Sequence, residues 1–229
     1  MIYFARERRM DMPYKFSAVL FDFDGTIADT GKGIFECLDY ACESLGKPKL
    51  TEEKRRMFIG PPLFDSFTSL VGCSPEEAEF AIMKYREQYN KGSMLHLEFY
   101  EGIIDLFDEL KNVGIKTAVC SSKPAPFVIK ILEHYGLREK VSCISCPGKD
   151  GAKMSKEEMI NGAVKVLAVS KEETLMVGDR KYDIEGATAA GVKSAGVTYG
   201  YGTAEELIAA GADFIADDIS DLRNIVFCK

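Results

Sequence analysis

Apolar residues along the chain alternate between short runs rich in β-branched side chains and longer stretches with the periodicity of a helix. The short runs predict buried strands, and the longer stretches, such as 103–114 and 124–136, predict amphipathic helices. Strands that alternate with helices are typical of an α/β protein whose parallel sheet is covered on both faces. The predicted strands span residues 17–23, 115–121, 141–145, 174–178, 192–198 and 213–216.

One long stretch breaks this alternation, because residues 31–97 contain helical patterns and no convincing strand. We therefore expect residues 31–97 to form a helical domain inserted into an α/β core made of residues 17–30 and 98–229. Residues 1–16 form an N-terminal extension in this interpretation. Glycines in both crossings between the two domains predict that the helical domain opens and closes over the strand ends.

The composition narrows the choice of partners. The chain has 29 Lys and Arg against 36 Asp and Glu, a net charge of −7, and no basic stripe, so nucleic acid and anionic membranes are poor partners. Its first twelve residues contain no apolar run long enough for a secretory signal or a membrane span. Seven scattered cysteines do not describe a disulfide framework, and we expect a cytoplasmic protein. The sequence does not determine the oligomeric state, and we favour a monomer.

Two cysteines, Cys143 and Cys146, have the C-x-x-C spacing that can hold a metal ion or cycle between thiol and disulfide. There is no second pair, and neither histidine of the chain lies nearby. The two cysteines also fall in the apolar run of a predicted strand that ends at Pro147. This context favours two plain thiols in the core over a metal or redox site.

Polar side chains follow the predicted strands at their carboxyl ends, which is where open α/β sheets bind ligands. After the first strand, the turn at Gly25 and Thr26 is expected to leave backbone N–H groups free to bind an anion. The strand ends together supply carboxylates, hydroxyls and ammonium groups, namely Asp22, Asp24, Ser121, Ser122, Lys123, Lys149, Lys153, Lys156, Asp179 and Asp183.

Clustered carboxylates repel one another and raise each other's pKa unless a cation lies among them. Oxygen ligands without a nearby His or Cys suit a hard ion, and Mg²⁺ bound by a few carboxylates together with a substrate phosphate is the common case. Lys156 opens a helix capped by Ser155, where its charge is mildly unfavourable unless an anion is bound there. The alternative for Lys156 is a solvated side chain offset by Glu157 and Glu158.

Four motifs in order resemble those of the haloacid dehalogenase-like (HAD) hydrolases, and specifically the phosphatases with a helical cap inserted after the first motif. The motifs are LFDFDGT, AVCSS, the lysine that opens KEEMI, and VGDRKYD, and the resemblance covers nearly the whole chain from Ser17. GPPL and TYGYG resemble the branch that contains phosphoglycolate phosphatases and 5′-nucleotidases. The resemblance implies a Rossmann-like, doubly wound parallel sheet with an inserted α-helical cap.

The resemblance also implies a Mg²⁺-dependent phosphatase that hydrolyses a small phosphorylated metabolite, a phosphoglycolate- or nucleotide-like monoester, through an aspartyl-phosphate intermediate. Asp22 is then the nucleophile and Asp24 the general acid and base. Ser121 and Lys156 bind the phosphoryl oxygens, with Lys153 as the alternative to Lys156. The implied metal ligands are Asp22, Asp24 through its backbone carbonyl, Asp179 and Asp183, and the expected substrate- or phosphate-binding residues are Gly25, Ser122, Lys123, Gly60 and Pro61.

Two other functions fit parts of this pattern. A sugar-phosphate mutase of the same architecture is the alternative enzyme. A receiver-like or non-catalytic phosphoacceptor protein also uses acidic residues, a hydroxyl and a lysine, but such domains look shorter and have no helical insertion. Asp24 favours phosphate-ester chemistry within the family, because carbon–halogen cleavage needs no acid at that position.

Overall fold

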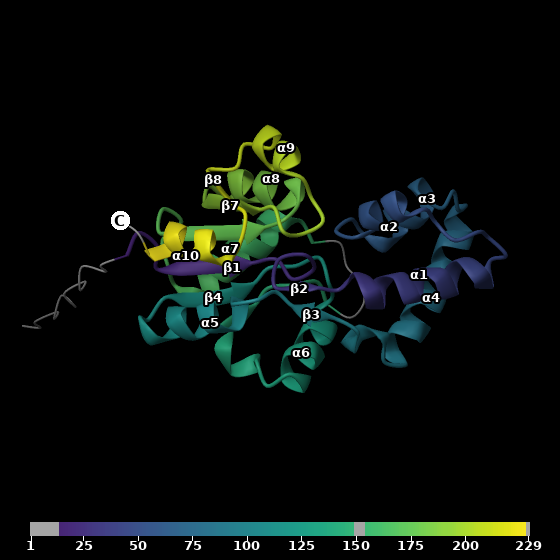
Figure 1. Ribbon diagram of the computed structural model, residues 1–229, viewed down its shortest axis with the longest axis horizontal. Coiled ribbons are helices and arrows are strands. Elements are labelled where there is room, and N and C mark those ends of the chain that lie inside the picture. Colours follow the sequence, from purple (N-terminus) through teal and green to yellow (C-terminus); the bar gives the residue numbers. More distant parts are fainter. Residues whose placement is uncertain (1–13, 149–153, 228–229) are drawn as a thin grey trace, which may run out of the picture.

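The computed structural model describes residues 14–148 and 154–227, so most of the predicted N-terminal extension lies outside the described residues. Its centre is a six-stranded, all-parallel sheet with the strand order β5-β4-β1-β6-β7-β8 (Figure 1). These are the six strands that the apolar runs predict, and the predicted doubly wound parallel sheet is confirmed. The strands are β1 (Ala18–Phe21), β4 (Lys116–Val119), β5 (Cys143–Ile144), β6 (Thr174–Gly178), β7 (Lys193–Val197) and β8 (Phe214–Ala216).

Strand β1 lies in the interior of the sheet, where Ala18 pairs with Lys116 of β4 on one side and with Thr174 of β6 on the other. All four residues of β1 are buried. A strand that is covered on both faces has a continuous run of apolar residues. For this reason β1 could be predicted from the sequence. The strand order reverses around β1, and the crevice at the carboxyl ends beside it is the expected ligand site of such a sheet.

Helices cover both faces of the sheet. The side chains of Val19 and Phe21 pack into one apolar cluster with α5, α6 and α10, whereas Ala18 and Leu20 pack into a second cluster with α7 and α8. These elements are α5 (Ile103–Asn112), α6 (Ala125–His134), α7 (Lys156–Leu167), α8 (Lys181–Ala190) and α10 (Ile219–Phe227), joined by α9 (Ala204–Ala209) and the 3₁₀ helix η2 (Arg138–Lys140).

The stretch without predicted strands is helical, as expected, and it has an apolar core of its own around residues such as Leu38, Phe58 and Phe67. Figure 1 shows its helices to one side of the sheet, beyond the small ribbon of β2 and β3. That antiparallel ribbon was not predicted, because two strands of two residues are too short for an apolar pattern. The elements are β2 (Ala28–Asp29), α1 (Gly31–Ser44), α2 (Glu52–Phe58), α3 (Leu63–Ser69), α4 (Pro75–Asn90), the 3₁₀ helix η1 (Ser93–Leu95) and β3 (Glu98–Phe99).

The two cysteines of the C-x-x-C pair point to opposite faces of the sheet. Cys143 belongs to the apolar cluster under α7, whereas Cys146 packs against the cluster on the other face. Both are free thiols, and burial raises the pKa of each. Two sulfur atoms on opposite faces cannot ligate one ion, so the structure agrees with the prediction of plain core thiols. None of the described helices has the length and apolar character that crossing a membrane requires.

Candidate active site

Three buried carboxylates meet at the carboxyl end of the sheet. Asp22 follows β1, Asp179 follows β6, and Asp183 lies in the first turn of α8. One carboxylate oxygen from each of the three lies within 4.8 Å of the others, and the exposed fractions of Asp22, Asp179 and Asp183 are 8%, 0% and 2%. Hard divalent cations prefer such an all-oxygen set, so the cluster can hold a metal ion of the Mg²⁺ type.

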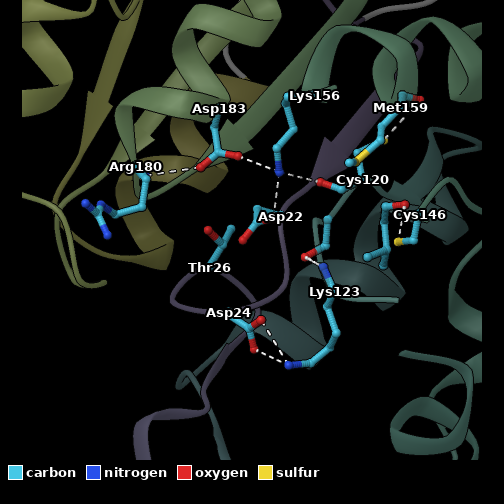
Figure 2. Close-up of polar contacts among 12 residues, drawn as sticks. Asp22, Asp24, Thr26, Cys120, Lys123, Cys146, Lys156, Met159, Arg180 and Asp183 are labelled. Carbon is cyan, nitrogen blue, oxygen red and sulfur yellow. Dashed lines mark hydrogen bonds and ion pairs between the residues drawn. The ribbon is translucent and has the colours of Figure 1, made fainter. Parts of the chain in front are cut away.

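Lys156 lies between two of these carboxylates, although it belongs to α7, the helix that follows β5. Its Nζ is 2.7 Å from Asp22 Oδ1, 2.7 Å from Asp183 Oδ1, and 2.9 Å from the carbonyl oxygen of Cys120 (Figure 2). Burial lowers the pKa of the ammonium group, but the charges of Asp183 and Asp22 outweigh burial and raise it. The interaction with two carboxylates offsets the unfavourable position of Lys156 at the start of α7, which has the predicted capping box of Ser155 and Glu158.

The cluster carries more negative charge than Lys156 neutralises. Burial raises the pKa of Asp22 from its ordinary 3.8 to about 6, Lys156 opposes this shift, and the charges of Asp183 and Asp24 add to it. Burial, with the charges of Asp183 and Asp22, also raises the pKa of Asp179 well above its ordinary value. A divalent cation among these oxygens would stabilise their ionised forms.

Asp179 is held in place by two donors. Thr26 Oγ1 donates to Asp179 Oδ1 at 3.1 Å, and the backbone N–H of Tyr201 donates to Asp179 Oδ2 at 2.8 Å. Gly25 permits this arrangement, because a Cβ atom on Gly25 would lie 2.2 Å from Asp179 Oδ2. Glycine is required there for a second reason, since the φ of Gly25 is +91°.

The prediction of a free backbone N–H at Gly25 is wrong. The N–H of Gly25 donates to the carbonyl oxygen of Ala28 at 2.9 Å, and the N–H of Thr26 donates to that of Phe23 at 3.4 Å. The turn closes on itself, so its amide hydrogens are used within the turn and do not point to an anion. Gly25 therefore leaves space for the Asp179 carboxylate, but it offers no free N–H group to a phosphate.

Asp24 lies apart from the three-carboxylate cluster. Lys123 Nζ is 2.7 and 2.9 Å from its two carboxylate oxygens (Figure 2). Thr30 Oγ1 also donates to its Oδ1, at 2.6 Å. Burial lowers the pKa of Lys123, but the charge of Asp24 outweighs burial and raises it. The Asp24 carboxylate therefore faces Lys123, and its place among the metal ligands rests on its backbone carbonyl, as the family resemblance implies.

The other residues expected at the site lie around the same crevice. Ser121 is buried after β4, where its Oγ accepts from the N–H of Lys123 at 3.3 Å. A cavity of about 660 Å³ lies between the strand ends and the helical insertion, and Ser121, Ser122, Gly60 and Pro61 contribute to its lining. Lys153 lies outside the described residues.

The chain matches the family model of the haloacid dehalogenase-like hydrolases over residues 19–197. It belongs to this family. It is 31% identical over 216 residues to a 5′-nucleotidase of Pseudomonas aeruginosa, which covers 94% of this chain and 98% of that protein. It is also 31% identical over 218 residues to a phosphoglycolate phosphatase of Vibrio parahaemolyticus, covering 91% of this chain and 95% of that protein.

The fold agrees with this relationship. The crystal structure of a predicted phosphatase from Clostridium acetobutylicum superposes with a TM-score of 0.85 at 35% identity, covering 92% of this chain and 97% of that chain. The predicted class of enzyme, a phosphatase of the haloacid dehalogenase-like family, is thereby confirmed. The two relatives have different names, so they do not identify the substrate of this protein. The substrate has to be inferred from the geometry of the site.

Two residues of this haloacid dehalogenase-like site were missed by the sequence reasoning. Tyr201 holds Asp179 through its N–H, and its hydroxyl donates to Asp29 Oδ1 at 2.6 Å, at the crossing into the insertion. Arg180 donates from Nη1 to the carbonyl oxygen of Ile59 at 2.6 Å. The VGDRKYD motif contains Arg180, and TYGYG contains Tyr201, but nothing in either motif indicates a contact with the distant insertion.

Proposed function

We propose that the protein is a Mg²⁺-dependent phosphatase that hydrolyses a small phosphate monoester, phosphoglycolate- or nucleotide-like, in two steps through a phosphorylated Asp22. The observation that carries this proposal is the position of Asp22. Its carboxylate belongs to the three-carboxylate cluster and also contacts the Lys156 ammonium group at 2.7 Å. A carboxylate between a cation site and a fixed ammonium group is placed to attack a phosphorus atom whose oxygens those cations bind.

In the first step, a carboxylate oxygen of Asp22 forms a bond to phosphorus while the bond from phosphorus to the ester oxygen breaks. Asp24 gives a proton to the departing oxygen, which leaves as an alcohol. Lys156 and the hydroxyl of Ser121 bind the phosphoryl oxygens and offset their charge. Lys123 and Thr30 stabilise the Asp24 carboxylate that remains after the proton has left.

In the second step, Asp24 takes a proton from a water molecule, and the water oxygen forms a bond to phosphorus. The bond between phosphorus and Asp22 breaks, which releases inorganic phosphate and restores the Asp22 carboxylate. Asp22, Asp179, Asp183 and the backbone carbonyl of Asp24 would hold Mg²⁺, whose charge lowers the repulsion between the phosphoryl group and these carboxylates.

We further propose that residues 31–97 act as a cap over this site. Two arginines link the helical insertion to the core close to Asp179. Arg180 of the core donates to Ile59 at 2.6 Å, and Arg56 of α2 donates to the carbonyl oxygen of Gly200 at 3.4 Å. A closed cap excludes water from the phosphoryl group and brings the loop at Gly60 and Pro61 to the leaving group.

The test is phosphate release from p-nitrophenyl phosphate in the presence of Mg²⁺. The wild type should release phosphate steadily, and Asp22→Asn should release none, because an amide neither attacks phosphorus nor binds the metal as a carboxylate does. Asp105→Asn is the matched control, since Asp105 is an exposed residue of α5 that does not line the cavity. Turnover by Asp22→Asn near the wild-type rate would refute the proposed nucleophile.

A further inference from the structure

The cavity between the strand ends and the insertion has one wall made by a single face of α4. Ile82, Tyr85, Arg86 and Tyr89 all line the cavity, and their spacing of i, i+3, i+4 and i+7 places them on one side of the helix. Tyr89 marks the catalytic end of this wall, because Lys123 Nζ lies 5.3 Å from the centroid of its ring.

The wall extends well beyond the phosphoryl site. Along the helix axis, Arg86 is about 4.5 Å and Ile82 about 10 Å further than Tyr89 from the catalytic end, at a rise of about 1.5 Å per residue. A two-carbon leaving group such as glycolate would end beside Tyr89. The rest of the wall, including Arg86, would then contact no part of the substrate.

Aromatic rings dominate this part of the cavity. Tyr85 and Tyr89 are stacked, with ring centroids 5.8 Å apart and planes at 20°. Phe58 lies 6.3 Å from Tyr85, and Phe127 of α6 lies 5.0 Å from Tyr89. All four side chains line the cavity together with Phe64. Phe58, Tyr85 and Tyr89 are only 1%, 6% and 5% exposed, so the half-buried rings of Phe64 and Phe127 offer the surface on which another flat ring can stack.

Arg86 places a cation among these rings. Among the described residues, it is the one cationic side chain that the insertion contributes to the cavity lining. It is half-buried, and within the described part of the chain its guanidinium group has no hydrogen bond or ion pair. Lys84 on the same helix differs, because its ammonium group pairs with Glu87 at 3.0 Å outside the cavity.

The hydroxyl of Tyr85 is a second polar group without a partner in this wall. Tyr85 is only 6% exposed, and its hydroxyl makes no hydrogen bond to any residue that the structure describes. Both groups lie in the cavity lining, where polar atoms of a ligand can pair with them. A guanidinium group matches a pair of acceptors on one edge of a heterocycle, because its donors form a planar fork.

We propose that the cavity binds a phosphate monoester whose leaving group ends in a flat heteroaromatic ring with hydrogen-bond acceptors, read by Arg86. This inference rests on the proposed phosphatase function and specifies its substrate. The distance between Tyr89 and Arg86 requires a spacer about the size of a sugar between phosphate and ring. A nucleoside 5′-monophosphate has this arrangement, whereas in pyridoxal 5′-phosphate the ring directly follows the phosphate-bearing carbon.

The experiment compares kcat/KM for guanosine 5′-monophosphate, whose N7 and O6 form a pair of acceptors on one edge, with ribose 5-phosphate, phosphoglycolate and pyridoxal 5′-phosphate, all with Mg²⁺. We expect kcat/KM for the nucleotide to exceed that for ribose 5-phosphate at least about tenfold, as a bidentate contact between an arginine and two acceptors of a base allows. Arg86→Met should remove most of this preference and leave the rate with ribose 5-phosphate within about twofold, because the phosphoryl contacts stay in the core. Lys84→Met is the matched control, because it removes a cation of the same helix that lies outside the cavity. This variant should keep the preference for the nucleotide over ribose 5-phosphate.

Equal kcat/KM values for the nucleotide and ribose 5-phosphate would overturn the inference while leaving the phosphatase function intact. A higher value for pyridoxal 5′-phosphate than for the nucleotide would overturn the assignment of a sugar-sized spacer. Hydrolysis of none of the four esters would refute the proposed function instead. Calorimetric binding then tests the cavity separately: tighter binding of the nucleotide than of ribose 5-phosphate, lost in Arg86→Met, supports the inference, and equal binding refutes it.

Discussion

Lys123 and Asp24 are 99 positions apart in the sequence, yet the ammonium nitrogen of Lys123 lies 2.7 and 2.9 Å from the two carboxylate oxygens of Asp24. Both side chains are nearly buried, with 6% and 14% of their surfaces exposed. Lys123 Nζ also lies 5.3 Å from the centroid of the Tyr89 ring in α4. Lys123 therefore connects the proposed acid and base of the core with the wall of the substrate cavity.

Lys123→Met should lower kcat about 10- to 100-fold with alkyl phosphates, because Asp24 loses the cation that orients it and general acid–base catalysis contributes about 10²- to 10⁴-fold. The loss should be smaller with p-nitrophenyl phosphate, whose leaving group needs no proton. Steady-state kinetics with both esters measure this difference. Lys130→Met, at an exposed lysine of α6, is the control, and an equal loss with both esters would contradict the pairing argument.

Asp24→Asn should stop the hydrolysis of alkyl phosphates and trap a covalent intermediate with p-nitrophenyl phosphate. The good leaving group allows Asp22 to be phosphorylated without an acid, but no base remains to activate water for the second step. Intact-protein mass spectrometry after rapid quenching should show one added phosphoryl group. Absence of covalent phosphate in both the variant and the wild type, under all quench times, would argue against the two-step mechanism.

Mg²⁺ should raise the melting temperature of the wild type, since a ligand that binds only the folded state stabilises it by about 2.7 kcal/mol at a hundredfold excess over Kd. Asp179→Asn should lose most of this shift, because it removes one of the three clustered carboxylates. Glu185→Gln is the matched control at an exposed residue of α8. A full Mg²⁺ shift in Asp179→Asn would place the ion elsewhere. Ca²⁺ should support less activity, because it is larger and takes more ligands.

Gly25→Ala should have two separate effects, a lower stability of the fold and a displaced Asp179 carboxylate. An alanine at φ +91° strains the backbone by about 1–2 kcal/mol, and its Cβ would lie 2.2 Å from Asp179 Oδ2 and displace that carboxylate. Gly46→Ala is the control, because Gly46 also has a positive φ of +65° but no atom within 4 Å of a Cβ. Denaturant unfolding with and without Mg²⁺ should show lower stability for both variants, and loss of the Mg²⁺ effect only for Gly25→Ala. An unchanged Mg²⁺ effect in Gly25→Ala would show that Asp179 tolerates the displacement.

The amino-acid pattern predicted the six strands of the sheet, the helical character of the insertion, and the polar residues that gather at the strand ends. These features are local, because an apolar run or a residue just after it is read directly along the chain. Asp22, Lys156, Asp179 and Asp183 converge as expected, since carboxyl ends of parallel strands share one edge of the sheet. The boundaries of the cap, residues 31 and 97, stay a prediction.

Which of these groups contact one another depends on how the elements pack in three dimensions. The N–H of Gly25 is used within its own turn, Lys123 pairs with Asp24, and Arg180 reaches Ile59 in the insertion. The sequence could not determine these contacts, because each depends on side-chain rotamers and on distances between elements that are set by packing. The same holds for Arg86, which in the sequence is one charged residue of an amphipathic helix. Its position in the aromatic wall follows from the way α4 packs in the insertion and faces the strand ends across the cavity.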